Sequence, residues 1–362
     1  MVSVLDAARR LVQEQPRHRV ISLYLDLNPE QFATAPARAS QIHSLIDEAA
    51  REVDGDTTLS HEERVALRED LQRLRSYLLS REPPFKGAKA LAVFCSGRDG
   101  LFETVQLKRA VQARVVIERR PYVEPLMDGA RQLRWCVALV NRREGRIFSG
   151  PADEAEEDER LEQGPLVQDP DDHLRNVAER VYRRWQREQF ERLALGGPQE
   201  VVPRLEQLLH DELRPRLVSE RIDVDLSSAT GERVREALAK LVEGEEQHME
   251  REALDRLAAG IGSGGRAVGH PKGTLEALNE RRVQTLLLAP DFDRTGSRCP
   301  TCGVLVLDAD GECPADGSEL EAQDHLRESV VEAALTQDAE VMVVRRYPDL
   351  GPFEGIAALL RF

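Results

Sequence analysis

The pattern of apolar and polar positions divides the chain into three stretches, each with its own strands and helices. In the first stretch, an amphipathic helix opens the chain, and apolar residues then alternate along a strand. Ser60 and Glu63 have the spacing of a capping box at the start of a long helix. The predicted elements of this stretch are strands at 20–27, 88–95, 101–107 and 113–118 and helices at 39–53 and 61–80.

The second stretch begins with two apolar strands, at 135–140 and 146–149, joined by a polar turn at 141–145. An acidic run at 153–163 follows, with seven carboxylates and one arginine, and its charge predicts a solvated loop. A helix is expected from 173 to 190, because apolar residues recur there at helical spacing. These residues are Leu174, Val177, Ala178, Val181 and Trp185.

Strands and helices alternate in the remainder of the chain, which favours parallel strand pairs with crossover connections. The glycine-rich segment 260–265 lacks the lysine of a phosphate-binding loop, so we expect a hinge between the second and third stretches. The predicted elements are strands at 191–195, 216–224, 282–288, 339–345 and 355–362 and helices at 203–213, 230–259, 273–280 and 325–335.

At 362 residues the chain is too long for one ordinary hydrophobic core. We expect an α/β fold of three domains, at residues 1–130, 131–262 and 263–362. The net charge of −15 argues against a protein that coats nucleic acid, DNA included, by bulk electrostatics, since a like-charged surface repels phosphate. The sequence has no apolar run of membrane-spanning length and no signal-peptide pattern, so we expect a cytoplasmic protein without a membrane partner.

Three of the five cysteines lie in one short segment, 298–317, which indicates a zinc-ribbon-like insertion in the third domain. Two knuckles of the Cys-x-x-Cys type are present, and in the second an aspartate replaces the last cysteine. The predicted ligands of a structural zinc ion are Cys299, Cys302, Cys313 and Asp316. His325 is a weaker candidate ligand, and a loop that binds no metal is the alternative.

The polar side of the helix at 173–190 carries four arginines, and such a row can follow an RNA backbone. The candidate RNA-binding residues are Arg180, Arg183, Arg184 and Arg187. A salt-bridged, solvated helix face is the alternative, because Glu179 and Glu188 lie on the same helix. His173 is expected to be a surface residue rather than an acid or base, and Cys95 to be a buried apolar residue.

Five segments carry a resemblance to a known family. They are VALVNRREGRIF (137–148), HLRNVAERVYRRW (173–185), RLALGGP (192–198), GTLEALNERRVQTLLL (273–288) and GIAALLRF (355–362). With these segments in this order, residues 130–362 resemble the bacterial branch of the archaeal and eukaryotic peptide-chain release factor family. That branch includes relatives of Pelota and of the ribosome hibernation factor Balon.

The resemblance implies an RNase H-like central domain and a C-terminal domain similar to the L7Ae/L30e fold, in which relatives carry zinc-ribbon insertions. Release factors of the family carry Gly-Gly-Gln before the basic helix, where it orients water for hydrolysis of peptidyl-tRNA. Here residues 153–172 contain no Gly-Gly pair, and Gly196-Gly197-Pro198-Gln199 lies after the next strand. No catalytic residue can be carried over.

We therefore expect a non-enzymatic, ribosome-associated translation factor that occupies the tRNA site in hibernation or rescue under stress. Its partners would be the ribosome, through ribosomal RNA, and a translational GTPase. One alternative is a peptidyl-tRNA hydrolase or release factor that uses other loop residues, such as Gln163 or Gln168. Another is an interaction scaffold unrelated to ribosomes, which the charge of −15 favours.

Overall fold

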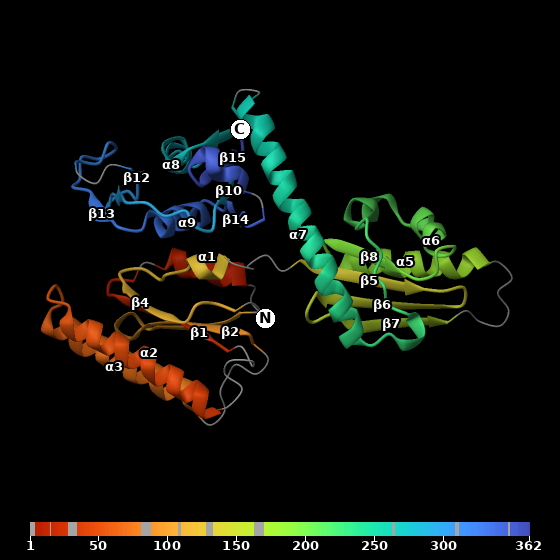
Figure 1. Ribbon diagram of the computed structural model, residues 1–362, viewed down its shortest axis with the longest axis horizontal. Coiled ribbons are helices and arrows are strands. Elements are labelled where there is room, and N and C mark those ends of the chain that lie inside the picture. The colour runs from red at the N-terminus through yellow and green to blue at the C-terminus, as the bar shows by residue number, and fades with distance from the viewer. Residues whose placement is uncertain are drawn as a thin grey trace. The chain divides into compact units, whose positions relative to one another are not determined.

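The computed structural model describes residues 4–14, 16–27, 35–80, 88–107, 110–127, 133–162, 170–262, 265–307, 311–346 and 348–362. Contacts group the chain into two compact units: the first combines Met1–Arg131 with Ala253–Phe362, and the second is Gln132–Glu252. The predicted mixed α/β fold is confirmed, with helices packed on the sheets of both units (Figure 1). The division into three domains at 130 and 262 stays a prediction.

An antiparallel sheet of order β3-β2-β1-β4 forms the N-terminal part of the first unit. Helices α2 and α3 cover one face, where Leu23 of β1 lies in a hydrophobic cluster. The predicted capping box is confirmed, since the Ser60 hydroxyl accepts from Glu63 N and the Glu63 carboxylate accepts from Ser60 N. The bounds are β1 Val20–Asp26, β2 Ala90–Ser96, β3 Leu101–Leu107, β4 Arg114–Glu118, α2 Ala35–Gly55 and α3 His61–Leu78.

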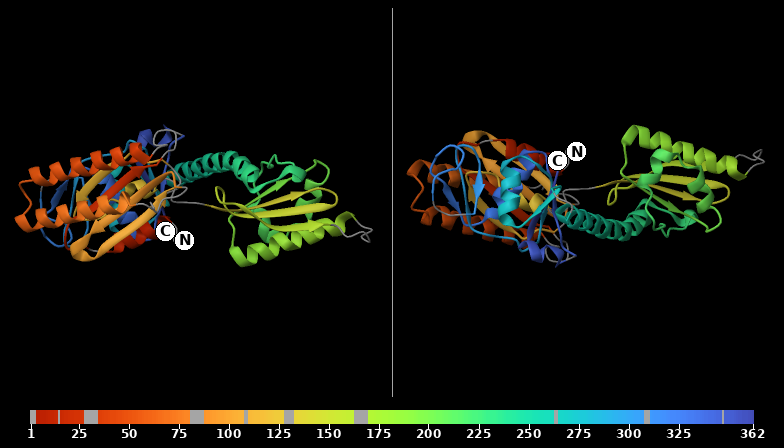
Figure 2. Two further views of the ribbon diagram at one scale, coloured as in Figure 1. Left: turned by 90° about the horizontal axis from the view of Figure 1, so that it is seen from below. Right: turned by 90° about the horizontal axis from the view of Figure 1, so that it is seen from above.

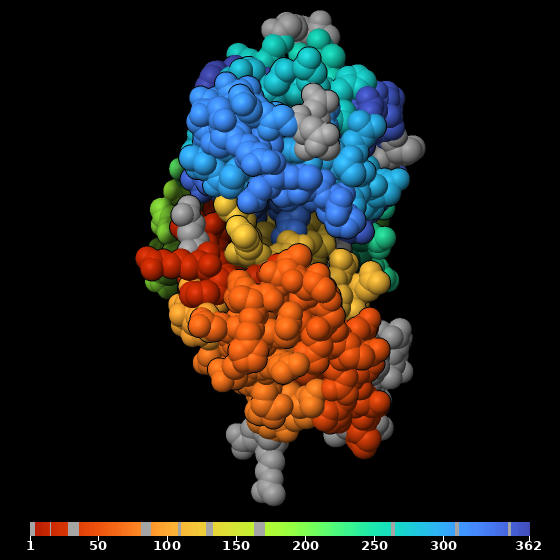
Figure 3. Space-filling view, turned by 90° about the vertical axis from the view of Figure 1, so that its left-hand side faces the viewer, coloured from red at the N-terminus to blue at the C-terminus, as the bar shows by residue number. Residues whose placement is uncertain are grey.

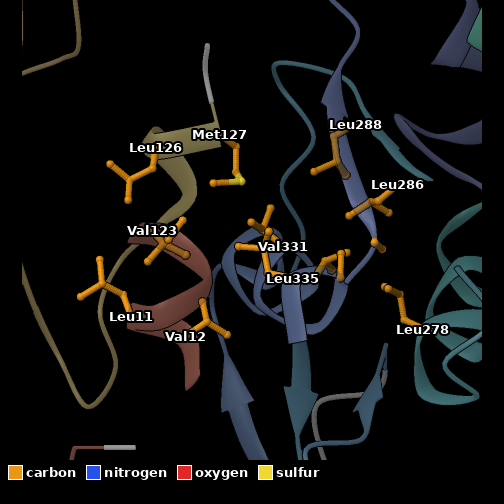
Figure 4. Close-up of a cluster of buried hydrophobic side chains, with 14 of the residues drawn as sticks. Leu11, Val12, Val123, Leu126, Met127, Leu278, Leu286, Leu288, Val331 and Leu335 are labelled. Carbon is orange, nitrogen blue, oxygen red and sulfur yellow. The ribbon is translucent and has the colours of Figure 1, made fainter. Parts of the chain in front are cut away.

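Two short helices on the other face of this sheet join it to the C-terminal part of the unit. They are α1 (Val4–Gln13) and α4 (Glu124–Met127), and both contact α9 (Leu326–Thr336). Figure 4 shows Leu11 and Val123 on one side of this cluster, with Val331 and Leu335 of α9 beside them. In Figure 3 the C-terminal part, in blue, lies directly against the first region. The first and third stretches of the sequence therefore share one core.

The C-terminal part is a sheet of order β14-β10-β15-β9 between two helical layers. Strand β10 pairs parallel with β14, as the sequence predicts, and antiparallel with β15. Leu286 belongs to the cluster with α8 and α9, whereas Leu287 belongs to the cluster with the end of α7. The bounds are α7 Gly231–Gly262, β9 Ala267–Gly269, α8 Pro271–Asn279, β10 Val283–Leu288, β14 Glu340–Val343 and β15 Ile356–Leu360.

A separate small sheet of order β12-β11-β13 holds the cysteine segment. Its strands are β11 (Gly296–Arg298), β12 (Leu305–Val306) and β13 (Glu321–Gln323). Asn279, at the end of α8, donates to Leu305 O and accepts from Leu305 N, both at 2.9 Å. Residues 296–307 and 311–323 are termed the ribbon below.

The second unit is built on a sheet of order β7-β6-β5-β8, in which β5 and β8 run parallel. Helices lie on both faces of this sheet (Figure 2). Alternate residues of β5 enter two cores: Cys136 packs in a cluster with α5 and α6, and Val137 in a cluster with α7. The predicted apolar face of α5 is confirmed, because its apolar residues lie in or against the first of these clusters. The bounds are β5 Arg134–Val140, β6 Glu144–Pro151, β7 Glu156–Glu162, α5 Pro170–Glu188, β8 Arg192–Gly196 and α6 Val202–Leu208.

The prediction of a loop for the acidic run at 153–163 was wrong, because most of the run forms the edge strand β7. Arginines of neighbouring elements pair with its carboxylates, which removes the repulsion that the sequence pattern indicates. Leu161 is buried, so the strand also contributes to the core. A charged edge strand of this kind resists pairing with further strands.

The prediction of a strand at 216–224 was also wrong. Only Val218 N and Ile222 N donate to β8 carbonyls, at 2.9 and 3.0 Å, so no continuous ladder forms. The helix expected at 203–213 ends at Leu208, and a 3-10 helix follows at Asp211–Arg216. Helix α7 continues through Gly262, so the first residues of the expected hinge are helical, and 263–264 lie outside the described residues.

Candidate functional site

The four predicted metal ligands lie together in the ribbon. Their ligand atoms, three Sγ and one carboxylate oxygen, are all within 4.8 Å of one another. Cys302 Sγ lies 3.4 Å from Cys313 Sγ, and Cys299 Sγ lies 3.5 Å from Asp316 Oδ2. Ligands of a tetrahedral zinc ion are about 3.5–3.8 Å apart, given the usual zinc–ligand distances. The donor set and its spacing therefore fit a metal ion.

The two knuckles have matching backbone geometry. Gly303 N donates to Cys299 O at 3.0 Å, and Gly317 N donates to Cys313 O at 2.9 Å. Both glycines have positive φ, of 78° and 73°, which a side chain would strain. Backbone N–H groups also point at sulfur, from Cys302 to Cys299 Sγ at 3.3 Å and from Ala315 to Cys313 Sγ at 3.4 Å.

Cys299 and Asp316 favour the ionised form. By contrast, a backbone hydrogen bond lowers the pKa of the Cys302 thiol, but desolvation and hydrogen bonds with Cys299 and Cys313 raise it to about 12. Desolvation opposes ionisation of Cys299, but donation by the Cys302 N–H and its neighbours lowers the pKa of this thiol to about 7. The Ser318 hydroxyl and N–H hold the pKa of Asp316 well below its usual range. A metal takes thiolate and carboxylate rather than their protonated forms, so the surroundings of Cys299 and Asp316 suit a cation.

His325 is not part of this cluster. Its Nδ1 lies 2.6 Å from Asp293 Oδ2, and this contact raises the pKa of the imidazole. Among the described residues, the group that could hold a metal is the set of three cysteines and Asp316.

The four predicted RNA-binding arginines differ in their surroundings. Arg180 pairs with Glu159 of β7 at 2.9 Å, and Arg183 pairs with Glu179 on its own helix at 2.9 Å. Arg184 is held more firmly, since it donates to Ser149 Oγ and pairs with Asp158 at 2.5 Å and Glu188 at 3.0 Å.

Arg183 and Arg187 are exposed. Arg187 makes no ion pair or hydrogen bond within the part of the chain that the structure describes. Arg187 is therefore accessible to a polyanion, Arg183 is accessible but paired with Glu179, and Arg184 ties α5 to the sheet.

The structure also places the residues considered for catalysis. His173, expected at the surface, is 4% exposed, and its Nε2 has no hydrogen-bond partner among the described residues. It is buried because the start of α5 packs on β6, where a Cβ on Gly145 would lie 3.8 Å from His173 Cε1. Gln163 and Gln168 lie outside the described residues. Cys95 is fully buried, as predicted, and burial raises the pKa of its thiol to about 12.

Backbone packing explains why glycine stands at both 196 and 197. A Cβ on Gly196 would lie 2.7 Å from Ile222 O, and one on Gly197 would lie 2.1 Å from Val140 O. Gly197 also has φ +141°. Close backbone packing at the end of β8 therefore requires both glycines, independently of any hydrolytic role.

Sequence reasoning missed a group of charged residues in the first unit. Glu332 of α9, whose side chain is 9% exposed, binds both Arg120 and Arg298. Arg327 pairs with Glu124 at 2.8 Å nearby. The available signal was a glutamate within the apolar helix Leu326–Thr336, where a buried carboxylate requires a partner.

A known protein family matches part of the second unit. Residues 137–238, from β5 to the first part of α7, match the model of a family described as bacterial archaeo-eukaryotic release factor family 12. The predicted resemblance to this bacterial branch is confirmed. The match spans the central sheet, α5 and α6 and leaves the ribbon outside it. None of the curated proteins matches the chain.

Solved structures of related factors are similar to this chain at low identity. The archaeal translation termination factor aRF1 is 20% identical over 100% of this chain and 99% of that chain, with a TM-score of 0.28. Pelota of Archaeoglobus fulgidus is 19% identical over 75% of this chain and 79% of that chain, with a TM-score of 0.38. No helix among the described residues is long and apolar enough to cross a membrane.

Proposed function

We propose that this protein is a ribosome-associated translation factor that binds without releasing the nascent peptide, in hibernation or rescue. The observation that carries the proposal is the family match over residues 137–238. The absence of a Gly-Gly-Gln tripeptide from the sequence supports binding without hydrolysis. In this proposal the protein is cytoplasmic, occupies the tRNA site and can meet a translational GTPase there.

The proposal assigns a role to each part of the chain. The central region would be the RNase H-like domain, and the C-terminal region the L7Ae/L30e-like domain. The ribbon would hold a structural zinc ion on Cys299, Cys302, Cys313 and Asp316, since a three-thiolate, one-carboxylate set suits zinc. Zinc would supply a cross-link for the ribbon rather than chemistry on a substrate.

Exposed arginines of α5 would contact ribosomal RNA. Arg183 and Arg187 are exposed, whereas Arg184 is held by Asp158, Glu188 and Ser149. The acidic strand β7 lies beside α5, so RNA would approach α5 from the side opposite β7, where like charge does not repel it.

Co-sedimentation with vacant bacterial 70S ribosomes, at low and at physiological salt, tests the proposal. Binding that survives physiological salt is the expected result. The R183A/R187A variant should bind more weakly, and the slope of log affinity against log salt should fall by about 2, since each lost phosphate contact removes about one unit. The matched control is R233A/K240A, which removes the same charge from exposed positions of α7 on the other side of the sheet.

Absence of binding at both salt concentrations would overturn the ribosome proposal and favour the scaffold alternative. Equal effects of the two double variants would leave ribosome binding in place and remove the assignment of Arg183 and Arg187.

A further inference from the structure

Glu332 lies where three parts of the first unit meet. Arg298 of β11 donates through two nitrogens to its carboxylate, with Nη2 to Oε1 at 3.1 Å. Arg120, from the segment that follows β4, donates to the same Oε1. Arg298 and Glu332 are both largely buried, at 14% and 9% side-chain exposure. One carboxylate of α9 therefore bridges the ribbon to the N-terminal region.

Glu332 is the carboxylate that both guanidinium groups contact. The two guanidinium groups therefore depend on Glu332. If Arg298 moved away, a largely buried carboxylate would lose two of its donors, which is costly.

The position of Arg298 depends on the ribbon. Arg298 directly precedes the ligand Cys299 and lies in a strand of three residues. The ribbon strands are two or three residues long, and the ribbon as a whole buries few apolar residues, chiefly Cys299, Leu305 and Cys313. A sheet this small does not hold its conformation without a cross-link. A second contact, Arg119 to Glu321 of β13 at 3.8 Å, also joins the N-terminal region to the ribbon.

We infer that occupancy of the Cys3Asp site is coupled, through Arg298, Glu332 and Arg120, to the docking of the N-terminal region on the C-terminal part. An occupied site orders β11 and fixes Arg298 on Glu332, and Glu332 then holds Arg120. An empty site releases Arg298 and loosens the docked state. The apolar cluster of α1, α4 and α9 remains, so docking weakens without being abolished. This inference rests on the metal site proposed above. It does not depend on ribosome binding.

The test is hydrogen exchange of the full chain, with zinc bound and after chelation. The reporters are α1 and α9, which pack together, and the internal control is α2 and α3, which pack in a different cluster. Chelation should raise exchange in α1 and α9 by about tenfold, a typical strength for coupling between two sites. Exchange in α2 and α3 should not change. Unchanged exchange in α1 and α9 after verified metal loss would overturn the inference.

Two variants separate coupling from simple destabilisation. In E332Q, which leaves all four metal ligands in place, cobalt should still give its thiolate charge-transfer absorption, but α1 should exchange rapidly with or without metal. In R327A, which breaks the neighbouring pair with Glu124, exchange should rise while its metal dependence persists. A metal response retained in E332Q would contradict the inference, and so would failure of the wild-type chain to bind zinc or cobalt. Neither result depends on ribosome binding.

Discussion

The central sheet and the ribbon sheet are stabilised in different ways. The central sheet has an apolar core on each face, and Trp135 and Phe148 are almost completely buried in it. The ribbon has strands of two or three residues and is positioned by backbone knuckles, Asn279 and the four candidate ligands. A sheet with two cores can therefore carry a highly charged edge strand, whereas the ribbon depends on a few polar contacts.

Truncating a central core residue should have the largest effect. Phe148→Ala should lower the unfolding free energy of the second unit by about 3–5 kcal/mol, through lost burial and a cavity. Both tryptophans, Trp135 and Trp185, lie in this unit, so denaturant unfolding followed by tryptophan fluorescence measures it directly. Phe148→Leu is the control and should cost about 1 kcal/mol. Equal losses in the two variants would argue against cavity formation.

Removing the buried arginine of the central sheet should cause the next largest loss of unfolding free energy. Arg146 donates to Glu157 at 2.7 Å and to Leu226 O and Ala229 O at 3.1 and 2.7 Å. Arg146→Ala should cost about 2–4 kcal/mol in the same assay, because these acceptors lose their donor. Arg146→Lys should recover part of the loss. A cost near zero would mean that β7 does not depend on this residue.

The pairing of Glu157 with Arg146 should have a smaller, pH-dependent effect on the unfolding free energy. Its hydrogen bond with Arg146 holds the pKa of the Glu157 carboxyl below its usual 4.5. The stabilisation is present above that pH and is lost as the pH falls through the lowered pKa. The difference in unfolding free energy between wild type and Glu157→Gln should therefore shrink below pH 4.5. A difference that grows on acidification would contradict the assigned pair.

An exposed pair on α5 should matter least among the substitutions. Arg183 and Glu179 are i,i+4 partners at 2.9 Å with both side chains well exposed. Arg183→Ala should change the unfolding free energy by about 0.5 kcal/mol or less. If the stability of Arg183→Ala is nearly unchanged, loss of folding at this position does not explain an effect of R183A/R187A on ribosome binding.

Chelation should leave the tryptophan-detected unfolding of the second unit unchanged. The candidate ligands lie in the first unit, and the clusters around the central sheet contain none of them. A shift of this transition on metal removal would break the distinction between the two sheets.

The periodic elements could be predicted because their burial follows local pattern. The strand at 20–27, which packs on both faces, and the helix carrying Leu174 and Val181, which packs on one, each match an element of the structure. The ligand set could also be predicted from the sequence, because two knuckles with fixed spacing bring their own ligands together.

The failures all concern contacts with residues distant in the sequence, which are either formed or missing. The acidic run forms β7 because Arg146, Arg180 and Arg184 come from other elements to meet it. The expected strand at 216–224 makes only isolated bonds to β8. His173 is buried by β6, and Glu332 meets Arg120 from more than two hundred positions earlier in the chain. Local pattern does not contain these contacts.

Ribosome binding without peptide release is the central claim, and one experiment measures both parts of it. Ribosomes carrying labelled peptidyl-tRNA are incubated with the protein at physiological salt, and the protein in the ribosome pellet and the released peptide are quantified in the same sample. The account predicts protein in the pellet and peptide release no greater than without it. Release above that background, or no protein in the pellet, would contradict the account.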